Sequence, residues 1–161
     1  MSATFDSKRS RDEHSFIKTE SEVTTRDRLE ENVFMFMPKF QENVLLSKFS
    51  NYKIGGYARF FFAAKNEREI RWAVAEAKSK KLPIFILGGG TNLLMGEKGW
   101  DGLVLKPDID VLKANGNVVV AGAGVLMSDI CSFAASKSLA GLEWAGGLPG
   151  TVGGAIRGNA G

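Results

Sequence analysis

The 161-residue sequence contains only one cysteine, Cys131, and one histidine, His14. It is therefore poor in the residues that form disulfides and metal sites. A single cysteine excludes an internal disulfide framework and weakly favours a cytosolic location for the protein. One cysteine and one histidine are also too few for a metal site of these ligands, so we expect no metal. No apolar run reaches the roughly 18 residues of a membrane-spanning helix, and the charged N-terminus lacks the apolar segment of a secretory signal.

Neither positive nor negative charge is in large excess. Residues 1–33 carry six Lys or Arg and eight Asp or Glu, and the other residues carry 15 and 10. Without a dense basic run interleaved with aromatic residues, we expect no nucleic-acid binding, whereas the modest basic excess suits a small anionic ligand. The polar composition of residues 1–33 predicts a disordered extension, with a short amphipathic helix near residues 25–33 and His14 as a solvated side chain.

The chain after this extension shows the alternation of a strand, a helix and a strand. Tyr57–Ala63 is aromatic and apolar, as expected for a buried strand. Asn66 and Glu69 form a capping box for a helix whose apolar residues repeat at helical spacing. Pro83–Leu87 is a continuous apolar run that favours a strand covered on both faces. Together these elements predict a βαβ unit.

Further elements follow in the second half of the sequence. Gly102–Lys106 and Asn117–Ala121 are expected strands, and Asn115-Gly116 is a tight-turn signal. A second helix is expected over Leu126–Lys137, with Cys131 as a small buried apolar residue beside its apolar face.

A glycine-rich loop follows the expected strand at Pro83–Leu87. Gly88, Gly89 and Gly90 let successive backbone amides point at one site, and Thr91 and Asn92 add side-chain donors. Diphosphate oxygens are a natural occupant of such a cradle. The alternative is a tight turn in which the glycines serve geometry alone.

The common nucleotide-binding and hydrolase motifs are absent. The dinucleotide pattern G-x-G-x-x-G fails because Leu93 follows Gly88 and Gly90 where its third glycine belongs, and it fails after Gly122 and Gly124 because Met127 stands there. No Gly is followed by Lys, which excludes a Walker A loop, and no G-x-S-x-G elbow occurs.

The last 16 residues contain seven glycines, which predicts a second loop over Gly146–Gly161 that approaches a ligand closely. Pro149-Gly150 marks a turn within it. Two glycine loops, with Gly122 and Gly124 between them in the sequence, suggest a large ligand held between two lobes.

Four stretches of the chain together strongly resemble the UDP-N-acetylenolpyruvoylglucosamine reductases, also called UDP-N-acetylmuramate dehydrogenases. They are Ser50–Gly56, Pro83–Leu94, Val118–Gly124 and Gly141–Gly161, which occur in the family's order and spacing. The resemblance runs from about Phe40 to Gly161. It implies an α+β, two-lobed FAD-binding domain of the vanillyl-alcohol-oxidase-like (PCMH-type) superfamily.

The same resemblance implies a set of residues for noncovalently bound FAD. The first loop would place Gly88, Gly89, Gly90, Thr91 and Asn92 on the diphosphate, and Gly122 and Gly124 would approach the cofactor at the lobe interface. The last loop would place Gly146, Gly147, Pro149, Gly150, Thr151, Gly153 and Gly154 along the diphosphate and flavin. The family's catalytic residues are expected beyond Gly161, and Arg157, which precedes Asn159-Ala160-Gly161, does not match its catalytic arginine.

By this resemblance, residues 34–106 would form the first α/β lobe and residues 107–161 an incomplete second α+β lobe. The implied reaction is the NADPH-dependent reduction of UDP-N-acetylglucosamine enolpyruvate to UDP-N-acetylmuramate for peptidoglycan, in the bacterial cytoplasm, with no obligate protein partner. We expect an N-terminal enzyme fragment that is inactive alone. Another FAD-linked oxidoreductase of the superfamily, or a short noncatalytic flavin- or nucleotide-binding protein, stays open.

Overall fold

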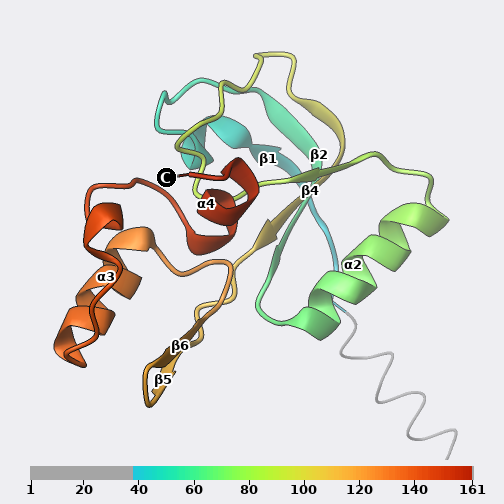
Figure 1. Ribbon diagram of the computed structural model, residues 1–161. Helices are drawn as coiled ribbons and strands as arrows, with labels where there is room; N and C mark the ends of the chain where they lie inside the picture. The colour runs from blue at the N-terminus through green and yellow to red at the C-terminus, as the bar shows by residue number, and fades with distance from the viewer. Residues whose placement is uncertain (1–37, 161) are drawn as a thin grey trace, which may run out of the picture. The chain divides into compact units, whose positions relative to one another are not determined.

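The computed structural model describes residues 38–160, in which eleven helices and strands follow the order shown in Figure 1. The expected extension at residues 1–33, its short helix and His14 lie outside the described residues. The elements are β1 (Gln41–Leu45), η1 (Leu46–Phe49), β2 (Tyr57–Ala64), α2 (Glu67–Ser79), β3 (Ile84–Ile86), β4 (Trp100–Pro107), β5 (Leu112–Asn115), β6 (Val118–Ala121), α3 (Met127–Ser136), η2 (Glu143–Ala145) and α4 (Val152–Gly158).

Four strands form the larger sheet, in the order β1-β2-β4-β3. The expected βαβ unit is present as β2, α2 and β3, but β4 lies between its two strands and pairs in parallel with both. The expectation that β3 is covered on both faces is wrong, because β3 is an edge strand and Ile86 is 55% exposed. β4 corresponds to the strand expected over Gly102–Lys106, but its place between β2 and β3 was not predicted, because a later strand that inserts into the sheet leaves no local signal of its position. β1 was also missed, and it pairs antiparallel with β2 at the open edge.

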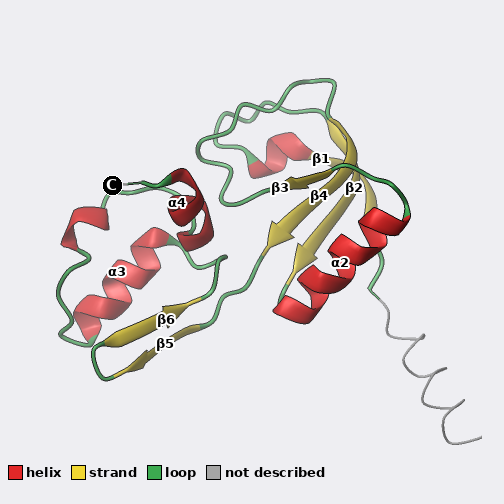
Figure 2. Cartoon of the chain, turned by 45° about the vertical axis from the view of Figure 1, so that its right-hand side comes forward, coloured by secondary structure: helices red, strands yellow, loops and turns green. Residues whose placement is uncertain are grey.

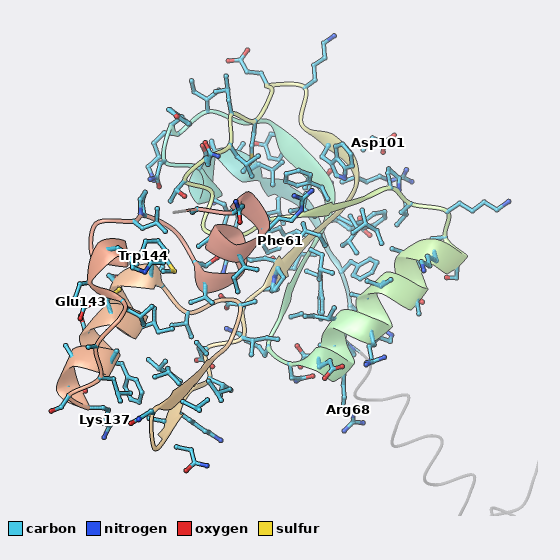
Figure 3. The ribbon with its side chains drawn as sticks, viewed as in Figure 1. Phe61, Arg68, Asp101, Lys137, Glu143 and Trp144 are labelled. Carbon is cyan, nitrogen blue, oxygen red and sulfur yellow. The ribbon has the colours of Figure 1, made fainter. Side chains whose placement is uncertain are left out.

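The two faces of this sheet bury different side chains. Leu103 and Leu105 of β4 pack with Ala73 and Ala77 of α2, while Val104 between them points into the cluster on the other face. This alternation is the period of two that a strand imposes. Figure 2 shows α2 lying along one face of the sheet. In Figure 3, Phe61 lies among the side chains of the sheet and is 3% exposed.

The capping residues predicted for the first helix are confirmed at the start of α2. The Asn66 side chain accepts a hydrogen bond of 3.0 Å from Glu69 N, and Glu69 Oε2 accepts one of 2.7 Å from Lys65 N. The return bond of a capping box usually comes from the cap residue itself, and here it comes from the residue before it.

The remaining elements begin with the β5–β6 hairpin, which turns at Asn115-Gly116 as expected, with Gly116 at a φ of +56°. Its second strand corresponds to the strand expected over Asn117–Ala121, whereas its first strand, β5, was not predicted. The expected second helix is α3, and Figure 2 shows it beside this hairpin. Cys131, which was expected to be buried, is only partly buried, and its thiol donates a hydrogen bond of 3.5 Å to Leu142 O. Among residues 38–160, no helix combines the length and apolar character needed to cross a membrane, and no acidic, histidine or cysteine side chains gather as a metal site.

Candidate functional site

The first glycine loop lies where the parallel strands of the large sheet end. Leu87 is fully buried, and its N–H donates to Leu105 O over 2.9 Å, which extends the pairing of β3 with β4 by one residue. Gly88 follows directly. In open sheets of parallel strands, ligands bind beyond the carboxyl ends of the strands, so this loop occupies the position expected for a binding site.

The backbone amides of this loop are unusually free. Within residues 38–160, the N–H groups of Gly88, Gly89, Gly90, Thr91 and Asn92 donate no hydrogen bond to another residue. Gly90 contributes its carbonyl instead, which accepts from Asn51 N over 3.3 Å. A row of unpaired amides can hold an anion with several oxygens, because each N–H carries a partial positive charge.

The glycines of this loop are required by close backbone packing. A Cβ on Gly90 would stand 1.7 Å from Phe49 O, and its φ of +67° lies in the left-handed region that favours glycine. A Cβ on Gly89 would stand 3.0 Å from Gly150 Cα. The structure therefore brings together the two glycine segments that are distant in the sequence.

The C-terminal glycine segment is partly helical, and the expectation of a loop over its whole length is wrong. Val152–Gly158 forms α4, and the Thr151 side chain caps it by accepting a hydrogen bond of 3.3 Å from Gly154 N. Glycine is a poor helix former, so tertiary packing overrides its propensity here. A Cβ on Gly153 would stand only 2.8 Å from Ala123 Cβ, which explains why glycine occupies this turn.

Several backbone N–H groups of the C-terminal glycine segment already donate hydrogen bonds within the protein. Gly153 N donates to Ala123 O over 3.0 Å, Gly154 N to the Thr151 hydroxyl, and Gly146 N to Glu143 O over 3.2 Å. The N–H groups of Gly147, Gly150 and Thr151 donate to no residue within 38–160, and Pro149 has none. These three amides are the ones that remain free for a ligand in this segment.

Gly122 and Gly124 also use their backbone amides within the protein and pack closely against its backbone. Their N–H groups donate to Val111 O over 2.7 Å and Ile109 O over 2.9 Å. A Cβ on Gly122 would stand 2.2 Å from Ile109 O, and one on Gly124 would stand 2.8 Å from Ile109 N. Both glycines thus join the segment after β4 to the loop before α3, and their predicted approach to a cofactor stays a prediction.

Charged side chains gather where β2 and β4 end. Asp108 forms ion pairs with Lys106 and with Lys65, and its backbone N–H donates to Ala64 O over 2.7 Å. Hydrogen bonds from Lys106 and then Lys65 hold the pKa of the Asp108 carboxyl below its usual range, and the bond to Asp108 raises the pKa of Lys65. Arg157, in the last turn of α4, is exposed.

One part of the loop's surroundings was not predicted as part of the site. Ser50, which is 2% exposed, donates to Leu93 O over 3.4 Å and accepts from Tyr52 N over 3.2 Å. With the Phe49–Gly90 contact and the Asn51–Gly90 hydrogen bond, this fixes residues 49–52 against the loop. The signal was available, because Ser50-Asn51 begins one of the stretches that carry the family resemblance.

Comparisons with known proteins agree with this geometry. The family model described as FAD binding domain matches residues 58–161. A UDP-N-acetylenolpyruvoylglucosamine reductase of Solibacter usitatus is 40% identical over 116 residues, covering 72% of this chain and 37% of the relative. One of Desulforamulus reducens is 41% identical over 123 residues, covering 75% and 41%.

A solved structure is also similar. The crystal structure of UDP-N-acetylenolpyruvylglucosamine reductase from Thermus caldophilus superimposes with a TM-score of 0.61 at 30% identity, and the match covers 76% of this chain and 44% of that one. The predicted fold class, an α+β FAD-binding domain of the PCMH type, is confirmed. The lobe boundary expected at residue 106 stays a prediction, and it falls within β4, one residue before its end.

The shares of the relatives that are matched lie between 37 and 43% for curated sequences, so the chain spans about two fifths of their length. FAD is the cofactor that gives the matching family its description, and the row of amides without a partner among residues 38–160 lies inside the matched residues. The chain belongs to the FAD-binding domain family, and within it to the FAD-binding part of the UDP-N-acetylenolpyruvoylglucosamine reductases.

Proposed function

We propose that this chain holds FAD noncovalently, with the diphosphate on the amides of Gly88–Asn92. The observation that carries the proposal is that these five consecutive amides, which follow the parallel edge strand β3 at its carboxyl end, donate to no residue within 38–160. The donor set fits the group, because a diphosphate offers several oxygens and no proton donors at neutral pH. The free amides of Gly147, Gly150 and Thr151 extend the donor set from the adjacent segment.

The remaining glycines named by the resemblance support the site through packing. Gly146, Gly153 and Gly154 use their amides within the chain, and Gly122 and Gly124 do the same. In this proposal they let the segments around the diphosphate approach one another. The binding is noncovalent in this proposal, since neither glycine loop contains histidine or cysteine, the side chains that would form a bond to the flavin.

FAD, when bound, supplies a ring that accepts a hydride and passes it on. We further propose that the whole protein reduces UDP-N-acetylglucosamine enolpyruvate to UDP-N-acetylmuramate with NADPH, as a cytoplasmic enzyme that acts on a small molecule. The names of the relatives and the match at 40% identity support this. The contribution of residues 38–160 is to bind and orient the cofactor, and the groups that protonate the substrate are expected outside them.

The test is FAD binding by the protein as its gene encodes it, with Gly89→Val as the variant. A side chain at this position would stand against Gly150, so the two segments must move apart and the amides lose their arrangement. We expect the purified wild-type protein to be yellow and the variant to lose the visible flavin absorbance. Gly96→Val is the matched control, because a Cβ there meets nothing within 4 Å. An unchanged FAD content in Gly89→Val contradicts the cradle.

A further inference from the structure

We infer that Thr151 is a positioning residue, whose hydroxyl lies beside Gly88 and holds the Gly88–Asn92 amide loop in place. This inference rests on the proposed function, since its consequence is measured on FAD binding. It gives Thr151 a role beyond offering its own amide to the cofactor.

Burial is the first observation. Thr151 is 6% exposed, and with Ser50 it is one of two polar residues that are buried within residues 38–160. A buried hydroxyl needs a hydrogen-bond partner, and Thr151 Oγ1 finds one by accepting from Gly154 N over 3.3 Å. This bond caps α4 and fixes the direction of the Thr151 side chain.

The same oxygen lies beside the first glycine loop. A Cβ on Gly88 would stand 3.2 Å from Thr151 Oγ1, which is tighter than an ordinary Cβ contact, so a side chain at position 88 would press on the hydroxyl. Next to this approach, Gly89 packs on Gly150, and a Cβ on Gly150 would stand 2.8 Å from Thr91 Oγ1. Thr151 therefore lies within the region where the two glycine segments pack together.

The backbone around Thr151 is held from the other side. Met127 N donates to Gly150 O over 2.9 Å, and Val152 N donates to Val125 O over 2.8 Å, which forms a short antiparallel bridge between Leu126 and Thr151. The backbone on both sides of Thr151 is thus anchored to the segment before α3, while its hydroxyl, bonded to Gly154 N, lies beside the loop after β3.

The Gly88–Asn92 loop needs such support because its own amides make no hydrogen bonds within residues 38–160. Glycines lose much conformational entropy when they are ordered, so a loop that is ordered before FAD arrives binds more tightly. Removing the hydroxyl also leaves Gly154 N without its acceptor. Losing an N-cap corresponds to about a five-fold change in an equilibrium constant, and we expect FAD affinity to fall by at least that factor.

The experiment is a double-mutant cycle on the protein as its gene encodes it, with the FAD dissociation constant measured by flavin fluorescence. The variants are Gly88→Ala, Thr151→Ala and the double variant. Gly88→Ala adds a Cβ against Oγ1, and Thr151→Ala removes that oxygen. We expect each single variant to weaken binding and the double variant to lose less than the product of the two losses. Losses that multiply would mean that Thr151 acts independently of Gly88 and would overturn the inference.

Three further variants guard against misfolding and against a purely structural effect. Thr151→Ser keeps the hydroxyl and should stay within about two-fold of wild type, whereas the isosteric Thr151→Val should lose about five-fold; equal losses would also overturn the inference. Asn66→Ala removes the cap of α2 instead, so it should lower the melting temperature without changing FAD affinity. If the wild-type protein binds no FAD, the proposed function itself fails, and this result is distinct from an additive cycle.

Discussion

Gly89 and Gly150 pack backbone against backbone, because a Cβ placed on Gly89 would stand 3.0 Å from Gly150 Cα. One glycine follows the strand β3 and the other precedes the helix α4, so this contact joins two halves of the candidate site that are distant in the chain. Neither position tolerates a larger residue without separating the segments. The contact explains why both segments are rich in glycine although only some of their amides are free.

Gly90→Ala should destabilise the protein and abolish FAD binding. The new Cβ would meet Phe49 O, and the φ of +67° costs a residue with a Cβ about 1–2 kcal/mol before any clash is counted. Gly96→Ala, where a Cβ has open space and φ is not positive, is the control and should change stability by less than about 0.5 kcal/mol. Thermal melts and FAD titrations measure both effects, and equal melting temperatures for the two variants would contradict the packing.

Two glycines of α4 should respond to alanine with opposite signs. Gly153→Ala places a Cβ 2.8 Å from Ala123 Cβ and should destabilise the protein by about 1–3 kcal/mol. Gly158→Ala meets nothing within 4 Å and should stabilise it by up to about 1 kcal/mol, because alanine favours a helix. Urea unfolding curves resolve the difference. Stabilisation by both variants would mean that the helix is not packed on Ala123.

Leu105→Ala should remove a large part of the stability of the sheet. Leu105 of β4 is fully buried on the face of the sheet that packs against α2, and truncation of such a side chain costs about 2–5 kcal/mol. Leu94→Ala deletes the same atoms from a side chain that is 72% exposed, so its effect should stay below about 0.5 kcal/mol. The measurement is the urea midpoint, compared only if the denaturant slopes agree.

Asp108→Asn should reduce the dependence of stability on pH in the acid range. Lys106 and Lys65 hold the folded-state pKa of Asp108 below its unfolded value of about 3.9, so ionised Asp108 stabilises the folded protein above pH ~4. This contribution is lost as the pH falls through the lowered pKa. Because the group is partly solvated, its size is about 1 kcal/mol or less.

Unfolding curves between pH 2 and pH 8 test this prediction. The difference in stability between wild type and Asp108→Asn should be constant above pH ~5 and shrink toward zero in strong acid. A difference that grows in acid would show that the ion pairs do not stabilise the fold. High salt should reduce the difference at neutral pH, since solvent-exposed charges are screened.

Local signals predicted several elements of the fold well. Asn66 and Glu69 marked the start of α2, and the aromatic and apolar run at Tyr57–Ala63 marked β2 almost to its last residue. The order of the strands could not be read in the same way. Phe61 and Val104 pair across β2 and β4, yet nothing near either residue specifies a partner so distant in the chain.

The candidate site shows the same division between local and nonlocal information. The amides of Gly88–Asn92 could be predicted, because three glycines after an apolar strand form a local pattern. The uses of Gly153 and Gly154 could not, because their N–H groups are taken by Ala123 O and the Thr151 hydroxyl only once the chain is folded. A count of glycines therefore overestimates the amides that a ligand can reach.

The place of β4 in the sheet has a consequence for synthesis on the ribosome. β2, α2 and β3 emerge before β4, although β4 must finally separate β2 from β3. The nascent chain can therefore pair β2 directly with β3 before their proper neighbour exists, and such a sheet has to open again to admit it. Translation order thus makes a wrong sheet available to this protein before the right one.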